Sequence, residues 1–345
     1  MKKTLTRVIL PALLVAFAFG AWAWRGLSDF ELQDADSTPL RFRAGHAELA
    51  GTLVLPRHRR AAPIALLVHG DGPRTRFDQD HYLPLVNSLL AAGIGVFSWD
   101  KAGVGDSGGD WLDQSMADRA DETRAAWLRV REATAGAHPI GLLGFSQGGW
   151  VVPRVASAFR PAFSAIVGGA VSWRAQGMYY TRQRMEAQGA DRAAIERRLR
   201  AEYADNDRLF GAAHAPADPR ARPDIAPRRF RFITLNYAED ATSALATMQG
   251  PVLALWGAWD RNVDPIDEAN AYRRAFAGHP DHLAEIAPGA THALLRARWF
   301  DYQLESDWPL WKQALFACLG RRAYEPGALA RLTGWINAQA APGAD

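Results

Sequence analysis

Short, uninterrupted apolar runs recur along this chain, and they restrict its fold more than any other feature. Five of them lie at residues 63–69, 93–99, 139–145, 162–171 and 251–256. A strand buried on both faces reads as such a run, whereas a strand with one wet face alternates apolar and polar residues. Stretches with apolar residues at helical spacing separate several of the runs, at 83–92, 116–132 and 150–159. This alternation predicts an α/β protein with a mostly parallel sheet flanked by helices.

Residues 172–248 interrupt the strand–helix rhythm. The part at 178–210 is rich in Arg, Glu and Ala at helical spacing, and 211–229 is rich in Pro and Ala. We interpret this region as a helical cap inserted between two strands, with most of its charges simply solvated. Weaker strands are expected at 41–44, 48–56 and 283–286, and a closing helix at 304–319. The predicted organisation is an N-terminal segment at 1–27, a core at 38–171 and 249–320, the cap at 172–248, and a C-terminal tail at 321–345.

The N-terminus predicts either an export signal or a membrane anchor. Lys2, Lys3 and Arg7 precede residues 8–24, which carry no charge. Ala21-Trp22-Ala23 has the small-x-small form of a cleavage site, which favours a signal peptide. The apolar stretch capped by tryptophans also fits a short membrane helix. Both alternatives place the folded domain outside the cytoplasm, as a periplasmic, secreted or membrane-anchored protein.

Composition excludes several functions. The 40 basic and 37 acidic residues are interspersed and give a net charge of only +3, so no nucleic-acid partner is expected. The single cysteine, Cys318, excludes an internal disulfide and a cysteine-based metal site. The histidines lack paired ligand spacing, and the glycine-rich stretch 103–109 lacks the context of a dinucleotide site. We therefore expect neither a metal nor a cofactor.

A serine between glycines supplies the first chemical signal. Gly144-x-Ser146-x-Gly148 follows the run 139–145 and precedes the helix at 150–159. A serine hydroxyl is a poor nucleophile unless a base takes its proton and a third group orients that base. Asp260 follows the strand at 251–256, and His292 follows the strand at 283–286. The order Ser, Asp, His on such a sheet is typical of a nucleophile elbow with its partners.

Five motifs in this order together carry a family resemblance. They are H-G-D-G-P (69–73), W-D-K-A-G-V-G-D-S-G-G (99–109), G-F-S-Q-G-G (144–149), W-G-A-W-D-R-N-V-D-P (256–265) and G-A-T-H (289–292). From about residue 40 to residue 320 the chain resembles an α/β-hydrolase, in the branch of esterases and serine aminopeptidase-like enzymes with dienelactone-hydrolase-type domains. The resemblance implies that fold with a helical cap, and a serine hydrolase that cleaves carboxylic esters through an acyl-enzyme. The alternatives are an aminopeptidase, amide or lactone hydrolase on the same triad, or a membrane-tethered binding protein without catalysis.

The resemblance also implies roles for single residues. Ser146 is the expected nucleophile, His292 the general base and Asp260 the acid that orients it. Asp264 is a competing acid, but before Pro265 it is expected to cap a helix. Three further histidines are weaker candidates for the base: His69 belongs to a structural turn, and His279 and His282 precede the last strand.

Two backbone N–H groups should bind the oxyanion of the tetrahedral intermediate. One is that of Gln147, and the other is that of Asp71, with Gly72 as second choice. The carboxylate of Asp71 would oppose the developing charge, so we expect it to point away, toward Arg74 or Arg76. Relatives usually carry an Arg where this chain has Ala102, which leaves the geometry of that loop open.

Aromatic residues flank the expected site. Trp150, Trp173 and Trp259 could form an apolar substrate pocket, although core packing is the alternative in a chain with 13 tryptophans. In the cap, Glu186, Glu202 and Asp205 are candidates for binding a substrate amino group. The expected partner is a small-molecule ester or amide, and the sequence does not indicate an oligomeric state.

Overall fold

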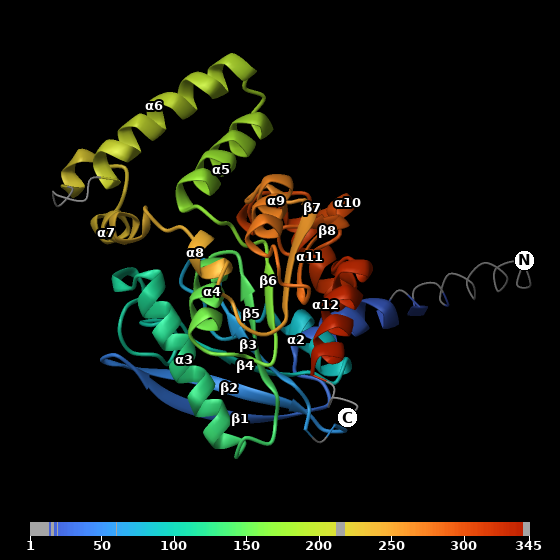
Figure 1. The fold of residues 1–345 in the computed structure, drawn as a ribbon. Coiled ribbons are helices and arrows are strands. Elements are labelled where there is room, and N and C mark those ends of the chain that lie inside the picture. The colour runs from blue at the N-terminus through green and yellow to red at the C-terminus, as the bar shows by residue number, and fades with distance from the viewer. Residues whose placement is uncertain (1–13, 15–16, 19, 60, 212–217, 341–345) are drawn as a thin grey trace, which may run out of the picture.

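An eight-stranded sheet forms the centre of the molecule (Figure 1). The computed structural model describes residues 14, 17–18, 20–59, 61–211 and 218–340. The strand order is β1-β2-β4-β3-β5-β6-β7-β8; β1 and β2 are antiparallel to their neighbours, and the others run parallel. The predicted fold class is therefore confirmed. The strands are β1 (Ala35–Ala44), β2 (Ala47–Pro56), β3 (Ile64–Val68), β4 (Gly95–Trp99), β5 (Ile140–Phe145), β6 (Ser164–Val167), β7 (Val252–Trp259) and β8 (His282–Thr291).

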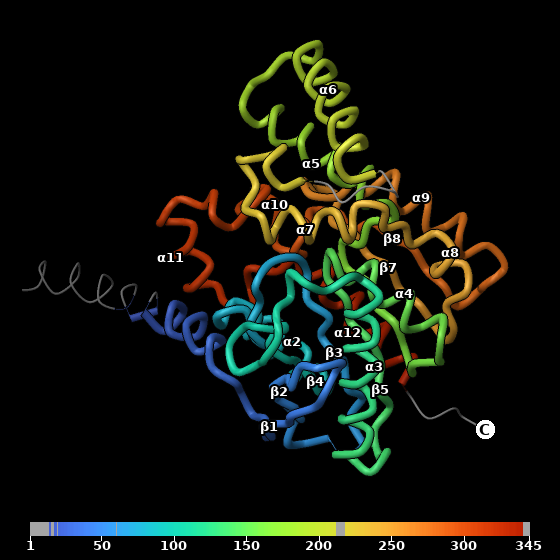
Figure 2. The backbone as a smooth tube through the Cα atoms, turned by 90° about the vertical axis from the view of Figure 1, so that its left-hand side faces the viewer, coloured from blue at the N-terminus to red at the C-terminus, as the bar shows by residue number. Residues whose placement is uncertain are grey.

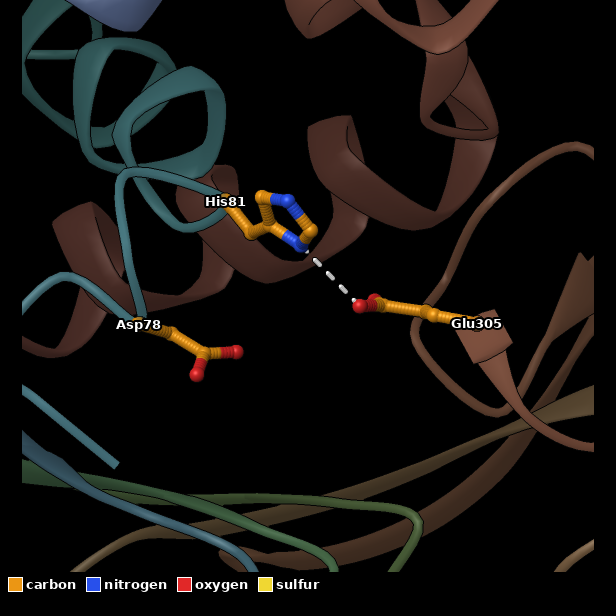
Figure 3. A group of neighbouring side chains, drawn as sticks. All are labelled: Asp78, His81 and Glu305. Carbon is orange, nitrogen blue, oxygen red and sulfur yellow. Dashed lines mark hydrogen bonds and ion pairs between the residues drawn. The ribbon is translucent and has the colours of Figure 1, made fainter. Parts of the chain in front are cut away.

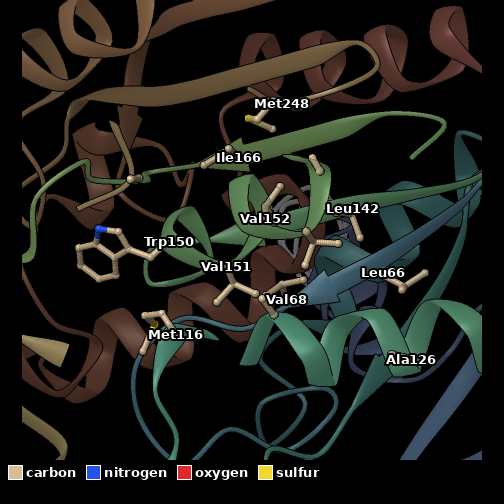
Figure 4. Close-up of a cluster of buried hydrophobic side chains, with 14 of the residues drawn as sticks. Leu66, Val68, Met116, Ala126, Leu142, Trp150, Val151, Val152, Ile166 and Met248 are labelled. Carbon is tan, nitrogen blue, oxygen red and sulfur yellow. The ribbon is translucent and has the colours of Figure 1, made fainter. Parts of the chain in front are cut away.

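Helices cover both faces of the sheet because successive strand side chains point to opposite sides. Leu66 and Val68 of β3 pack in one hydrophobic cluster, whereas Ala65 and Leu67 pack in the other. Figure 4 shows the first cluster, in which Val151 and Val152 of α4 contact strand residues such as Leu142. The helices on this face are α3 (Met116–Ala133), α4 (Gly148–Ala158), α8 (Thr242–Leu245) and α9 (Pro265–Ala275). The opposite face carries α2 (Leu83–Ala91), α11 (Leu310–Leu319) and α12 (Pro326–Gln339), and the short helix α10 (Ala297–Phe300) lies beside β8.

Several predicted boundaries are wrong for local reasons. The strand expected at 162–171 ends at Val167, because Gly168 turns the chain with a φ of +61°. The closing helix begins at Leu310 instead of 304, directly after Pro309. The expected C-terminal tail at 321–345 contains α12, whose Leu332, Trp335 and Ile336 are buried. Residues 341–345 lie outside the described part.

The cap rises above the carboxyl ends of the parallel strands, between β6 and β7 (Figures 1 and 2). It consists of α5 (Trp173–Ala187), α6 (Arg192–Phe210) and α7 (Pro227–Asn236). Within the predicted cap at 172–248, Leu245 of α8 and Met248 pack into the core. The helical region is therefore shorter than the inserted sequence.

The predicted export segment lies mostly outside the described residues, which omit 1–13, 15–16 and 19. The part that follows is docked on the domain: buried Asp29 accepts hydrogen bonds from the backbone and guanidinium of Arg321. Gly26 lies against the backbone of Cys318, where a Cβ would not fit. The folded domain thus begins before the predicted residue 38. In the described part of the chain, no helix is both long and apolar enough to span a bilayer.

Candidate active site

Ser146 occupies a strained turn between β5 and α4. Its φ is +50°, a region that non-glycine residues rarely adopt, and its N–H donates to Val167 O at 2.8 Å. The turn requires its glycines, because a Cβ on Gly148 would lie 2.7 Å from Val68 O and one on Gly144 would lie 2.7 Å from a methyl carbon of Val152. This strand–turn–helix geometry presents the serine side chain at the carboxyl edge of the sheet.

Asp260 and His292 meet beyond the ends of β7 and β8. His292 Nδ1 lies 2.7 Å from Asp260 Oδ2, and the Asp260 side chain is fully buried. The other oxygen, Oδ1, accepts the N–H groups of Asn262 and Val263 at 2.8 and 2.9 Å. These bonds fix the carboxylate in the orientation that binds the imidazole.

Asp264, the competing acid, has a different contact. Its side chain accepts the N–H groups of Ile266 and Asp267 at 3.0 and 3.1 Å, which caps α9 as the sequence predicts. Its carboxylate is therefore engaged at the N-terminus of a helix, where it also favours the helix dipole.

The turn at Gly168 contacts both the imidazole of His292 and the backbone of Ser146 through adjacent residues. A Cβ at Gly168 would lie 2.7 Å from both Cε1 and Nδ1 of His292, so the ring lies against this backbone. The preceding carbonyl, that of Val167, accepts the N–H of Ser146. The Ser146 hydroxyl makes no hydrogen bond to another described residue, and such bonds are often loose before substrate binds.

The loop after β3 lies against Ser146 from another side. A Cβ on Gly70 would lie 3.3 Å from Ser146 Cβ, so the backbone that leads to Asp71 contacts the serine directly. Gln147 is buried at the start of α4, where helix geometry leaves backbone N–H groups unpaired. Both predicted oxyanion donors therefore belong to segments next to Ser146.

Two buried basic side chains hold this loop. Lys101 Nζ donates to Gly70 O at 3.1 Å, and Arg119 donates to His69 O at 2.8 Å. Arg119 also donates to Gln147 Oε1 at 2.5 Å. Because a peptide unit is planar and trans, fixing the carbonyl of Gly70 also fixes the direction of the N–H of Asp71. The sequence contained no signal for these two roles.

His69 is a structural residue, as expected. Its Nε2 lies 3.0 Å from Trp99 O, and the ring is buried. Burial, and then the positive charges of Lys101 and Arg119, lower the pKa of His69 to about 3. The neutral imidazole is enclosed behind the loop and is not a base for Ser146.

The carboxylate of Asp71 points to a partner that the sequence did not suggest. Arg229 of α7 binds it with two hydrogen bonds of 3.0 and 2.5 Å, and the side-chain amide of Gln147 donates to it at 3.1 Å. The expectation of Arg74 or Arg76 is wrong, because their guanidinium groups pair with other carboxylates. Desolvation alone would raise the pKa of Asp71, but the bonds and charge of Arg229 outweigh it and hold that pKa below its usual value.

Arg76 braces the loop in which relatives carry an Arg at the position of Ala102. It donates to both oxygens of Asp100 and pairs with Asp106 at 2.6 Å. Ala102 itself is buried. The loop is therefore held by an arginine from another segment of the chain.

The predicted pocket tryptophans have different environments. Trp150 is 5% exposed, packs in the core and donates to Val171 O, so core packing is the correct alternative for it. Trp173 stacks on Trp150 with ring centroids 5.0 Å apart. Trp259 is 54% exposed and remains a candidate for substrate contact.

The cap contacts the acid side of the site through α5. Tyr179 donates to the carbonyl of Asp260 at 2.8 Å, and Gln176 donates to the carbonyl of Asn262 at 2.9 Å. The three predicted cap acids lie elsewhere and bind neighbours within the cap: Glu186 accepts from Gln183, Glu202 from Arg198 and Asp205 from Arg208. Sequence spacing alone did not indicate Tyr179 or Gln176.

One group among the described residues brings potential metal ligands together. Ligand atoms of Asp78, His81 and Glu305 lie within 4.8 Å of one another (Figure 3). Arg74 already binds Asp78 at 2.5 Å, and His81 Nδ1 lies 3.1 Å from Glu305 Oε2. These contacts join the loop after β3 to the segment before α11.

Comparisons with known proteins agree with this architecture. The model of a family described as "Serine aminopeptidase, S33" (Hydrolase_4) matches residues 61–298. A Pyrococcus furiosus esterase is 15% identical with a TM-score of 0.52, and the alignment covers 84% of this chain and 92% of that one. A Mycobacterium smegmatis proline iminopeptidase is 19% identical with a TM-score of 0.53, and the alignment covers 88% of this chain and 98% of that one. Est1E of Butyrivibrio proteoclasticus with bound ferulic acid is 17% identical with a TM-score of 0.50, and the alignment covers 80% of this chain and 96% of that one. No curated protein matches the sequence.

Proposed function

Because the chain belongs to the S33 serine aminopeptidase family of α/β-hydrolases, and is thus a hydrolase, we propose that it cleaves carboxylic esters through an acyl-enzyme on Ser146. The observation that carries the proposal is the His292–Asp260 pair, 2.7 Å apart, together with a left-handed turn at Ser146 whose N–H binds the residue before the glycine that contacts His292. This combination supports a functional role, since strained backbone at a non-glycine residue is concentrated at functional sites.

Each group then has a step in the proposed reaction. Ser146 Oγ attacks the acyl carbon while His292 takes its proton, and Asp260 stabilises the resulting imidazolium. The N–H groups of Gln147 and Asp71 bind the oxyanion. His292 next protonates the leaving alkoxide, and a water activated by the same imidazole hydrolyses the acyl-enzyme.

The cap favours an ester over an aminoacyl substrate. A peptidase that removes N-terminal residues needs a free carboxylate for the substrate ammonium. Glu186, Glu202 and Asp205 accept hydrogen bonds from cap side chains, and Asp71 is paired with Arg229. The alternative of amide or lactone cleavage on the same residues keeps the same nucleophile.

The test compares p-nitrophenyl acyl esters of increasing chain length with aminoacyl p-nitroanilides, using the wild type and Ser146→Ala. We expect ester turnover with kcat/KM at least tenfold above that of every anilide, and loss of both activities in Ser146→Ala. Faster turnover of the anilides would contradict the assignment of an ester substrate, but it would leave the assignment as a hydrolase in place.

We also propose that the domain is exported, on the support of Lys2, Lys3 and the uncharged residues 8–24. Fractionation of cells that express the full chain, with N-terminal sequencing of the product, checks this. A full-length product in the soluble cytoplasmic fraction would contradict it.

A further inference from the structure

The cap touches the site at two separate positions. Through α5 it binds the carbonyl of Asp260 on the acid side, and through α7 it binds Asp71 on the side of the oxyanion loop. Because the two contacts belong to different helices of one insertion, the seating of the cap and the geometry of the loop depend on each other.

The contact at Asp71 is an ion pair with Arg229, and it lies next to both predicted oxyanion donors. Asp71 supplies one predicted oxyanion donor through its N–H, and its carboxylate accepts from the side chain of Gln147, the residue that supplies the other. Arg229 neutralises that carboxylate with a two-pronged contact, and its guanidinium lies 4.9 Å from the ring centre of Phe232 and 5.7 Å from that of Trp111. The aromatic faces hold the cation in place.

We propose that Arg229 is a positioning residue that acts through Asp71 and makes turnover depend on a seated cap. This inference rests on the proposed function. With the pair formed, the carboxylate is neutralised and the loop is held in one position. With the pair broken, the carboxylate keeps only the Gln147 amide and the charge of Lys101 as compensation. A less neutralised negative charge then lies beside the place where the oxyanion develops, which raises the barrier because charge near a partly desolvated site is weakly screened.

The decisive experiment is a double-mutant cycle in which the second substitution is expected to restore part of the activity that the first removes. Arg229→Met is expected to lower kcat on a short p-nitrophenyl ester by about 10- to 100-fold, with KM changed less than threefold. Adding Asp71→Asn removes the unpaired charge but retains the backbone donor, so the double variant should recover at least threefold over Arg229→Met. A role confined to holding the cap would give no recovery.

The control is Arg174→Met. Arg174 makes a comparable two-pronged contact with Asp207, with both bonds 2.6 Å long, but the pair lies between α5 and α6. Its kcat should stay within threefold of the wild type. Arg229→Lys keeps the positive charge, so its kcat should fall less than that of Arg229→Met. If Arg229→Met fails to fold, the same comparison is made between Arg229→Lys and the double variant Asp71→Asn/Arg229→Lys.

The pH dependence supplies a second readout. Without Arg229, desolvation raises the pKa of Asp71 against only Lys101 and the N–H of Gly72, so the carboxylate protonates more readily than in the wild type. The ratio of kcat in Arg229→Met to kcat in the wild type should therefore rise as the pH falls. A constant ratio across the active pH range would overturn the electrostatic account.

Labelling with a fluorophosphonate separates this inference from the proposed function. If the folded wild type does not react, the proposed function fails. If the wild type reacts and Arg229→Met reacts at the same rate, only the inference fails. We expect the wild type to react and the variant to react 10- to 100-fold more slowly.

Discussion

The floor of the site and the cap above it differ in how much of their packing is buried. Under Ser146 the strands β5, β6 and β7 are buried apolar runs, and glycines stand where any side chain would collide with the catalytic groups. In the cap, α5 has no buried residue, and arginine–carboxylate pairs such as Arg174–Asp207 and Arg182–Glu196 join α5 to α6. Close packing thus positions the floor, whereas the cap combines exposed ion pairs with small apolar clusters such as that of Ile195, Leu199 and Tyr203, and substitutions in those ion pairs should differ in kind from substitutions in the floor.

The largest effect is expected at the acid. Asp260→Asn removes the charge opposite the imidazole and favours the wrong tautomer of His292, so kcat on an ester should fall by roughly 10³- to 10⁴-fold. Asp264→Ala is the matched control. It should lower the free energy of unfolding by about 1 kcal/mol, because α9 loses the hydrogen bonds to its N-terminus, and kcat should be nearly unchanged. A larger kcat loss in the Asp264 variant would reverse the assignment.

Gly168→Ala tests whether excluded volume positions the imidazole. The new Cβ would lie 2.7 Å from the His292 ring on a backbone with a φ of +61°, so the ring must move. A displacement of this size is expected to lower kcat by about 100-fold. Gly189→Ala in the cap has a similar φ of +79° but open space around it, and should leave kcat unchanged. Equal kcat for the two variants would contradict the comparison.

Glu268 lies where the cap joins the floor, accepting the N–H of Val171 at 2.8 Å. Burial raises its pKa from 4.5 to about 7. The folded state therefore keeps a proton that the unfolded chain releases first, so this residue lowers stability as pH rises from about 4.5 to 7. As the pH rises through that range, the free energy of unfolding of Glu268→Gln should increase relative to that of the wild type by up to about 3 kcal/mol. Urea unfolding at pH 4.5 and 8 measures it, and a stability difference that does not grow with pH would contradict it.

The smallest effect is expected within the cap. Arg182 and Glu196 are 2.8 Å apart, and both side chains are about one-third exposed. Arg182→Ala should lower the free energy of unfolding by less than about 1 kcal/mol. Leu142→Ala in the fully buried β5 should cost about 2–5 kcal/mol, and similar costs for the two variants would remove the distinction between cap and floor.

The same distinction explains what could be predicted from the sequence. The apolar runs predicted the sheet, because burial leaves a local pattern in the sequence. The order of Ser146, Asp260 and His292 after successive strands predicted that these residues lie at the same edge of the sheet. The pairing of Asp71 with Arg229 joins residues 158 positions apart, and nothing local marks which of the many arginines meets that carboxylate. The strand β6 was predicted too long because a glycine turn ends it, and the helix α12 was missed because tertiary packing decides it.

The most direct test of the proposed chemistry is the reaction of the folded full chain with a fluorophosphonate, followed by intact-mass measurement and peptide mapping. We predict one adduct per chain, located on Ser146, absent in Ser146→Ala and formed much more slowly in His292→Ala. A folded wild-type protein without an adduct, or with an adduct that persists in Ser146→Ala, would contradict the assignment of Ser146 as the nucleophile.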